Sequence, residues 1–402
     1  MSFVELGVRE CTSQSLVRSG ISDPNAVQLE AIPSLLKGCD AVIEAPTGSG
    51  KTLAFLIPLV ERLAGHRGGG IRALIVGPTR ELATQIAGVL AGLDPALRTG
   101  LLFGGVPYGK QLASLRNSPD VVVGCPGRIL DLAQQRQLRF DSVEYLVLDE
   151  ADEMFDQGFA RDVERIIALT PAQGRQTVLA SATMPDWVQT MIRKHLQTPD
   201  RIVVRKNLEP ALEHGLLPVP RDAKIDTLHR LLRQERGQTI VFHRTKHGAK
   251  KLARDLDKRG HFAGELQGNL SQNARDRVIT SFRKRETWVL VATNVAARGL
   301  DIEGVGLVVN YELPETPQWL THRVGRTARN GETGRALTFI TEDDHPQWHK
   351  LRRLGAPDLP RLDRTRLLES GEWSYEPQTK PATVPSRTYN RRLLRQRKPA
   401  RV

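Results

Sequence analysis

Short runs of aliphatic and β-branched residues recur along the chain and alternate with longer segments of helical periodicity. The runs form two groups, six in the first half and four in the second: 41–45, 71–77, 100–105, 120–124, 145–150 and 177–183, then 239–243, 288–294, 306–311 and 336–341. Strands that are apolar at nearly every position are typical of parallel sheets covered by helices on both faces. The pattern therefore predicts an α/β fold with two tandem parallel-sheet domains.

The region between the two groups of runs, residues 205–221, contains three prolines and no long apolar period, which is typical of a linker. After Asp344 no further strand pattern follows, prolines recur, and the chain ends in a basic, polar segment typical of disorder. We predict an N-terminal domain over 1–205, a linker over 206–220, a C-terminal domain over 221–357 and a disordered tail over 358–402. A length of 402 residues suits such a division.

The charge is unevenly distributed along the chain. Lys and Arg number 58 against 45 Asp and Glu, and this net charge of +13 favours a polyanionic partner such as nucleic acid or an acidic membrane surface. Residues 1–205 carry −1 and residues 206–345 carry +5, whereas residues 380–402 hold eight basic and no acidic side chains. The tail is therefore predicted to tether nucleic acid without sequence preference, and a solvated tail that aids solubility is the alternative.

Several features narrow the class of protein. No apolar stretch approaches the roughly 20 residues of a spanning helix, and the N-terminus lacks the layout of a secretory signal. The three cysteines are far apart and contain no C-x-x-C pair, so we expect neither disulfides nor a cysteine zinc site. The sequence predicts a soluble, cytoplasmic protein without membrane contact. Aromatic residues make up only 5% of the chain, which favours contact with a nucleic-acid backbone over base stacking.

A glycine-rich segment follows the first apolar run and precedes a helical pattern, which is the context of a phosphate-binding P-loop. Its residues are Ala45, Pro46, Thr47, Gly48, Ser49, Gly50, Lys51 and Thr52. The glycines allow backbone N–H groups to turn toward a phosphate, and the helix N-terminus adds positive potential. Lys51 would reach the terminal phosphates of a nucleotide and Thr52 would ligate Mg²⁺.

An acidic cluster follows the strand predicted at 145–148 and supplies the second half of a nucleotide site. Asp149 would hold Mg²⁺, directly or through water, and Glu150 would orient and deprotonate the attacking water. An acidic cluster after a strand is more often a solvated turn, but its pairing with the P-loop favours catalysis. A nucleotide triphosphate and Mg²⁺ are therefore the predicted ligands of this site.

The sequence Asp149-Glu150-Ala151-Asp152 and its surroundings resemble the DEAD-box ATP-dependent RNA helicases of helicase superfamily two, from about Phe3 to Asp343. The resemblance implies two RecA-like domains of the P-loop NTPase type, with ATP between them and RNA across both. Further segments resemble family motifs in the family's order: 78–83, 104–105, 126–128, 181–183, 241–246, 267–268, 292–301 and 322–329.

The resemblance also implies roles for individual residues. Eight would contact RNA: Thr79, Arg80, Gly104, Gly105, Arg128, Gly268, Arg275 and Thr293. Four would couple hydrolysis to RNA binding: Asp152, Ser181, Thr183 and His322. Arg326 and Arg329, three apart on an expected helix, would act as arginine fingers, and Asp301 would contact the ATP ribose.

Gln28 would bind the adenine edge, because its amide offers both a donor and an acceptor. The chain departs from the family pattern nearby, with Ile21 in place of an aromatic residue and Asn25 in place of Thr or Ser. Further departures are Cys125 for Thr, Asn294 for Asp and Ala328 for Gly. None of them removes a catalytic group, and Cys125 would weaken RNA affinity rather than the chemistry.

The leading hypothesis is therefore a monomeric ATP-dependent RNA helicase that separates short duplexes and remodels RNA or RNA–protein complexes. ATP and single-stranded RNA would bind cooperatively and close the two domains. One alternative is an ATP-gated RNA clamp or assembly scaffold without productive unwinding, which would use the same residues. A DNA translocase of the same superfamily is another, and the motif set speaks against it.

Overall fold

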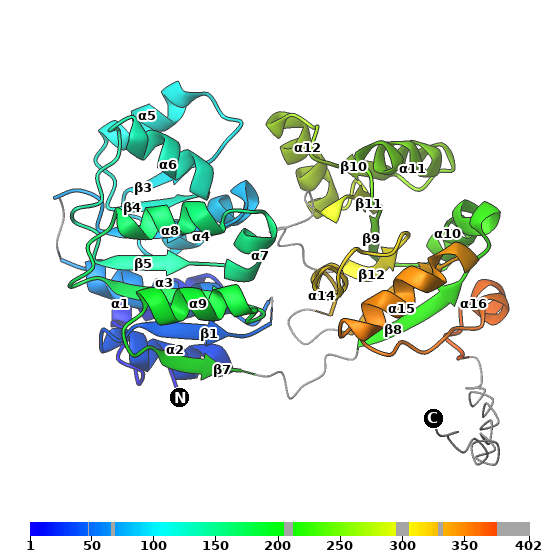
Figure 1. Ribbon diagram of the computed structural model, residues 1–402, viewed down its shortest axis with the longest axis horizontal. Helices are drawn as coiled ribbons and strands as arrows, with labels where there is room; N and C mark the ends of the chain where they lie inside the picture. Colours follow the sequence, from blue (N-terminus) through cyan, green and yellow to red (C-terminus); the bar gives the residue numbers. More distant parts are fainter. Residues whose placement is uncertain (47, 66–68, 205–211, 295–304, 329–332, 376–402) are drawn as a thin grey trace, which may run out of the picture.

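The computed structural model describes residues 1–375 except 47, 66–68, 205–211, 295–304 and 329–332, and it consists of two α/β domains (Figure 1). Thr47, Asp301 and Arg329, and the tail residues 376–402, lie outside the described residues. No helix in the described part of the chain is both long and apolar enough to cross a membrane.

In the N-terminal domain the described residues form a seven-stranded parallel sheet in the order β3-β4-β2-β5-β6-β1-β7. The strands are β1 (Ala41–Glu44), β2 (Ala73–Val76), β3 (Thr99–Leu102), β4 (Val121–Gly124), β5 (Tyr145–Leu148), β6 (Gln176–Ser181) and β7 (Asp200–Val203). The helices are α1 (Glu10–Arg18), α2 (Ala26–Leu36), α3 (Lys51–Leu63), α4 (Arg80–Leu93), α5 (Tyr108–Arg116), α6 (Pro126–Gln134), α7 (Ala151–Asp156), α8 (Ala160–Ala168) and α9 (Asp186–His195).

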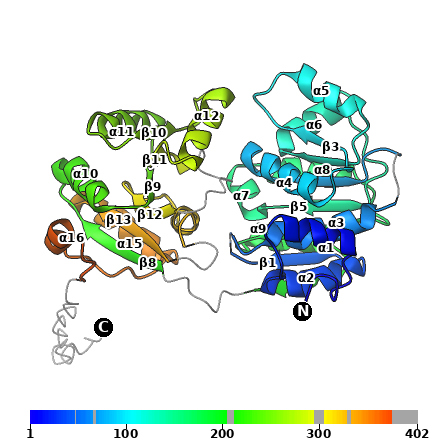
Figure 2. The same cartoon turned by 180° about the vertical axis from the view of Figure 1, so that it is seen from behind.

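Successive residues of each central strand enter two separate cores, as the two-residue period of a strand requires. Ile43, Ile75 and Val147 pack against α1 to α4 on one face, which is turned toward the viewer in Figure 2. Val42, Leu74 and Leu146 pack against α6 to α9 on the other face. Both faces of the sheet are thus covered, which explains why the central strands are apolar throughout.

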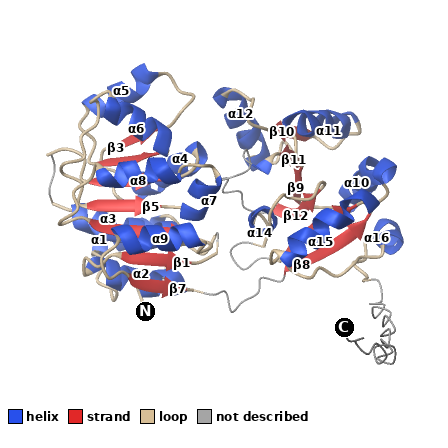
Figure 3. Cartoon of the chain, viewed as in Figure 1, coloured by secondary structure: helices blue, strands red, loops and turns tan. Residues whose placement is uncertain are grey.

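In the C-terminal domain the described strands form a second parallel sheet in the order β10-β11-β9-β12-β13-β8, covered by helices on both faces (Figure 3). Its strands are β8 (Leu212–Pro218), β9 (Gln238–Phe242), β10 (Ala263–Leu266), β11 (Val289–Ala292), β12 (Val305–Asn310) and β13 (Gly334–Ile340). Its helices are α10 (Lys224–Gln234), α11 (Lys246–Lys258), α12 (Gln272–Arg283), α14 (Pro317–Val324), α15 (His345–Arg353) and α16 (Arg364–Ser370), with short 3₁₀ turns at Arg221–Ala223 and Glu342–Asp344.

The prediction of a linker over 206–220 is wrong for residues 212–218, which form β8. This strand pairs in parallel with β13, from Leu212 opposite Gly334 to Pro218 opposite Ile340. Because β8 is the edge strand and Pro218 is its last residue, the missing N–H disrupts little of the ladder. Leu216 and Leu217 are buried in the domain core.

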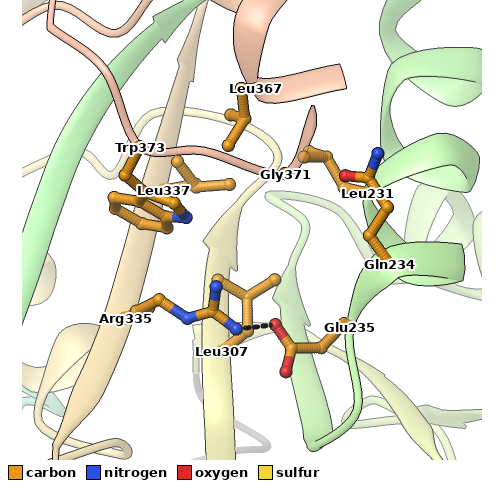
Figure 4. A pocket seen from close by; sticks show the side chains of 9 residues that line it. All are labelled: Leu231, Gln234, Glu235, Leu307, Arg335, Leu337, Leu367, Gly371 and Trp373. Carbon is orange, nitrogen blue, oxygen red and sulfur yellow. Dashed lines mark hydrogen bonds and ion pairs between the residues drawn. The ribbon is translucent and has the colours of Figure 1, made fainter. Parts of the chain in front are cut away.

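The predicted boundary between domain and tail at residue 357 is also wrong. Leu362, Leu367 and Leu368 are buried in the core of the C-terminal domain, and the Leu362 amide donates to the Leu216 carbonyl at 2.9 Å. We call residues 358–375 the C-terminal segment, and it contains α16. The Cζ atom of Arg335 lies 5.7 Å from the centre of the Trp373 ring in this segment. Figure 4 shows the small cavity enclosed there, with the Arg335–Glu235 ion pair at its base. The C-terminal domain therefore extends to at least Tyr375.

Candidate active site

The P-loop joins the end of β1 to the start of α3, as the sequence predicts. Gly50 is the N-cap of α3 and has a left-handed backbone conformation with φ 85°. A Cβ atom at Gly50 would lie 2.2 Å from Asn25 Nδ2 and 2.8 Å from Gln28 Nε2, so only glycine fits there. Gly48 is also left-handed, with φ 76°. The loop is thus shaped by the residues that pack against it.

Lys51 and Thr52 open helix α3 beside the loop. The Lys51 ammonium donates to the carbonyl oxygens of Ala45 and Pro46 at 2.6 and 2.9 Å, and the residue is only 8% exposed. The amide of Ser49 donates to Pro46 O at 3.3 Å. Lys51 therefore occupies the concave side of the loop, where a phosphate group would compete with the two carbonyl oxygens for its protons.

Gln28 is held next to the P-loop by a reciprocal helix cap. The backbone N–H of Gln28 donates to Asn25 Oδ1 at 3.1 Å, and the backbone N–H of Asn25 donates to Gln28 Oε1 at 3.0 Å. Gln28 Nε2 also donates to the Gly50 carbonyl at 3.3 Å. Asn25, which departs from the Thr or Ser of the family pattern, is thus a strong N-cap for α2. Gln28 can still donate its second Nε2 proton, and accept a further hydrogen bond at Oε1, when a nucleobase binds.

The two carboxylates at the end of β5 are buried close together. Asp149 is 3% exposed, and its Oδ1 accepts from the Glu150 amide at 2.9 Å. Burial, followed by the charge of Glu150, raises the pKa of Asp149 to about 7, and burial together with Glu153 raises the pKa of Glu150 to about 8. The charge of Lys51 opposes both increases. The arrangement concentrates negative charge that a cation would stabilise.

Glu150 has an unusual backbone conformation for a residue with a side chain. Its φ of 51° lies in the left-handed region, and it immediately precedes α7. Its buried Oε2 has no hydrogen-bond partner among the described residues. Strained backbone of this kind is often found at catalytic positions, where neighbouring contacts enforce it.

Asp152 connects the acidic cluster to the end of β6. Its Oδ2 accepts from the Thr183 amide at 2.9 Å and from the Thr183 hydroxyl at 2.7 Å, while the Asp152 amide donates to Ser181 Oγ at 3.3 Å. His322 of the C-terminal domain approaches from the other side, with its Nε2 3.9 Å from Asp152 Oδ2. The structure therefore brings the four predicted coupling residues together.

Glu153 is a site residue that the sequence analysis misses. Its Oε1 lies 3.2 Å from His322 Nδ1, and both side chains are less than a tenth exposed. The signal in the sequence is weak, because Glu153 follows a run that already contains three acidic residues. This contact joins the two domains.

The expectation that Arg326 lies on a helix is wrong. Helix α14 ends at Val324, and Arg326 is in the turn that follows, before Ala328 with φ 54°. Arg326 is nevertheless 4% exposed, and its positive charge opposes the increase in the pKa of Glu150 from across the domain boundary. The position of the Arg326 side chain is therefore set by the turn after α14 and not by the period of a helix.

Arg323 is the second residue that the sequence analysis misses. It is fully buried, which lowers its pKa to about 10, and it donates from Nε to Asn294 Oδ1 at 2.6 Å and from Nη1 to Glu312 O at 2.7 Å. Asn294 therefore accepts a hydrogen bond from the buried arginine where a carboxylate would form an ion pair. This contact fixes α14 against the segment after β11.

A groove of about 450 Å³ between the domains is lined by residues predicted to contact RNA: Thr79, Arg80, Gly104, Arg128, Gly268 and Arg275. Arg275 donates from Nη2 to Glu81 Oε1 at 2.6 Å, and Arg80 donates from Nη1 to Gln272 Oε1 at 2.8 Å. Gly105 lies beside the groove with φ 76°, and a Cβ there would be 2.4 Å from Arg80 Nη1. Thr293 is buried after β11 and does not line this groove.

Two further side chains shape the N-terminal half of the groove. Cys125 lines it, and burial raises the pKa of the thiol to about 12, so the thiol stays protonated at neutral pH. Arg128 lies over the Tyr108 ring at 4.1 Å and donates to the Val106 carbonyl at 3.3 Å. Tyr108, a third missed residue, holds the guanidinium in place.

Comparison with known proteins identifies the family. Residues 25–191 match the DEAD/DEAH box helicase model and residues 223–331 match the helicase conserved C-terminal domain. The ATP-dependent RNA helicase CshA of Listeria monocytogenes is 42% identical over 343 residues, covering 84% of this chain and 66% of that protein. The DEAD-box ATP-dependent RNA helicase CshA of Geobacillus kaustophilus is 39% identical over 376 residues, covering 92% and 80%.

Solved structures agree with this comparison. Dbp5 of S. cerevisiae bound to RNA and ADP BeF3 superposes with a TM-score of 0.81 at 30% identity, covering 91% of this chain and 96% of that one. Mss116p bound to single-stranded RNA and AMP-PNP gives a TM-score of 0.80 at 26% identity, covering 89% and 77%. The predicted fold class is confirmed, and the chain belongs to the DEAD-box family of ATP-dependent RNA helicases.

Proposed function

We propose that this protein uses ATP to close its two domains on single-stranded RNA, and thereby separates short duplexes and remodels RNA or RNA–protein complexes. The observation that carries the proposal is a set of polar contacts that crosses the domain boundary. His322 meets Asp152 and Glu153 near the P-loop, and Arg275 meets Glu81 in the groove. Both contacts depend on domain closure, so ATP and RNA would each favour the same closed state.

The nucleotide site has the groups that phosphoryl transfer requires. Lys51 would leave the Ala45 and Pro46 carbonyls to bind terminal phosphates, and Gln28 would bind adenine. The buried carboxylate of Asp149 and its raised pKa fit a bound cation, so Thr52 and Asp149 would hold Mg²⁺. When bound, Mg²⁺ would neutralise phosphate charge as it develops during transfer.

Glu150 would orient the attacking water and accept its proton. Burial raises the pKa of Glu150, which makes its carboxylate a stronger proton acceptor. Arg326 would supply positive charge from the C-terminal domain only when the domains are closed. Closure would therefore couple hydrolysis to the presence of RNA.

In the groove, arginines and exposed backbone would contact phosphates and 2′-hydroxyls with little reading of base sequence. Arg80, Arg128 and Arg275 come from both domains, so a strand that contacts all three must follow the closed groove. A strand held in that way cannot stay paired with its complement. We further propose that the protein acts as a monomer in the cytoplasm.

The experiment is ATP hydrolysis measured with RNA and with DNA of equal length and sequence. We expect stimulation by RNA and little stimulation by DNA. Glu150→Gln should abolish turnover while ATP binding persists, and Glu164→Gln, at an exposed ion pair of the same domain, should leave both unchanged. Equal stimulation by DNA would refute the choice of RNA, and unchanged hydrolysis in Glu150→Gln would refute the assigned base.

A further inference from the structure

Helix α11 of the C-terminal domain has a strongly basic outer face. Five cationic side chains on it are exposed: Lys246, Lys250, Lys251, Arg254 and Lys258. At about 100° per residue they fall within an arc of about 140°, and from first to last they span about 18 Å along the axis. We define these five residues as the α11 stripe.

The α11 stripe is rigidly presented. On the opposite face of the helix, Ala249, Leu252, Ala253 and Leu256 are buried in the core under the sheet. Thr245 caps the helix by accepting from the Gly248 amide at 3.1 Å. The arc holds one carboxylate, Asp257, and the nearest ion pair is weak, with Arg254 Nε 3.9 Å from Asp255 Oδ1. Most of the positive charge therefore faces solvent.

The stripe begins at the groove. Lys246 Nζ donates to Asn269 Oδ1 at 2.9 Å, and a Cβ at Gly268 would lie 3.3 Å from Lys246 Cε. Gly268 itself lines the groove together with Arg275. From Lys246 the helix runs along the outside of the domain beside β10, as Figures 1 and 2 both show. The basic surface thus continues a path that starts among the phosphate contacts of the groove.

We infer that the α11 stripe binds the phosphate backbone of RNA that continues beyond the groove, a site separate from the closed interdomain path. Lysine-rich faces without aromatic partners attract phosphates without reading bases, and they add affinity through counterion release. The inference rests on the proposed RNA-binding function. It explains how an RNA longer than the groove gains affinity from the folded C-terminal domain as well as from the basic tail.

The test compares two triple variants with equal loss of charge. Lys250→Gln, Lys251→Gln and Arg254→Gln remove the middle of the stripe. Lys350→Gln, Arg352→Gln and Arg353→Gln remove three exposed cations from α15, whose Trp348 and Leu351 pack beside β8 at the opposite edge of the sheet. Far-UV circular dichroism melts verify that both variants fold like the wild type.

Affinity is measured for the shortest single-stranded RNA that still stimulates hydrolysis, and for the same RNA with a single-stranded or duplex extension at either end. We expect the stripe variant to bind extended RNA about 10-fold or more weakly, with a salt slope less negative by about 2, since each lost phosphate contact removes about 0.7. Which extension responds identifies the form of RNA bound. Binding of the shortest RNA and turnover at saturating RNA should not change, and the α15 variant should match the wild type.

Equal weakening by both triple variants, or unchanged affinity and slope in the stripe variant, would overturn the inference. Failure of the wild type to bind RNA at all would instead overturn the proposed function, and the stripe with it. If the wild type and the stripe variant bind extended RNA alike, only the stripe is refuted.

Discussion

Replacing Glu153 by Gln tests whether the buried contact with His322 stabilises the closed state. The pair is 3.2 Å long and both side chains are less than a tenth exposed, so little solvent screens it. Removing one partner of a buried charge pair costs about 2–5 kcal/mol. Glutamine keeps the shape and can still hydrogen-bond, so we expect a smaller cost of about 1–2 kcal/mol, which shifts the closing equilibrium about 10-fold.

The assay is RNA-stimulated ATP hydrolysis as a function of RNA concentration. The contact exists only in the closed state, so its loss weakens closure on RNA. If the loss costs about 1.4 kcal/mol, the RNA concentration for half-maximal stimulation should rise about 10-fold. Thermal melting of the variant is measured alongside, to separate any loss of stability from the effect on closure. Glu164→Gln, which removes an exposed ion pair with Lys194 at 3.0 Å, is the matched control and should have no effect.

A double-mutant cycle with His322→Ala decides the interpretation. If the pair stabilises closure, the two effects on half-maximal RNA concentration will be less than additive. Fully additive effects, or a Glu153→Gln variant indistinguishable from Glu164→Gln, would show that the contact contributes nothing to closure.

Three further predictions concern the C-terminal half of the chain. Gly215→Ala should destabilise the C-terminal domain by about 1–3 kcal/mol in urea unfolding, because a Cβ there would lie 2.3 Å from Leu362 Cδ1, and unchanged stability would contradict the packing of the C-terminal segment. Burial lowers the pKa of His214 to about 4, from about 6.5 in the unfolded chain. The unfolded state therefore binds a proton that the folded state does not, so the free energy of unfolding should fall by at most about 3 kcal/mol as the pH falls from 6.5 to 4. His214→Asn should flatten this pH dependence, and an unchanged profile would assign it to other groups. Truncation after residue 379 should weaken RNA binding and flatten its salt dependence without loss of hydrolysis at saturating RNA, whereas unchanged binding would favour a merely solubilising tail.

The central strands could be predicted from sequence because helices cover them on both faces. Three of the four edge strands could not: β7, β8 and β10 have few buried residues, and their sequences therefore show no continuous apolar run. The fourth edge strand, β3, overlaps the apolar run at 100–105. The small number of buried residues in β8 also explains why residues 212–218 resemble a linker in sequence. Proline content indicates a break in structure, but Pro218 occupies the end of an edge strand, where it is tolerated.

The nucleotide motifs could be predicted because their spacing reflects local backbone geometry. The missed residues act over long distances in sequence: Glu153 meets His322, Arg323 meets Asn294, and Tyr108 meets Arg128. The spacing of Arg326 and Arg329 suggests a helix, but spacing alone does not reveal that α14 ends at Val324. These contacts form only when a domain folds or when the two domains pack against each other, so the local sequence does not reveal them.

Strand separation is the most direct test of the proposed function. A short RNA duplex with a single-stranded extension is incubated with the protein and ATP, with a non-hydrolysable ATP analogue, or without nucleotide. We predict separation with multiple turnovers only with ATP, and none by Glu150→Gln. RNA-stimulated hydrolysis with stable RNA binding but no separation of strands would contradict the account and favour an ATP-gated clamp.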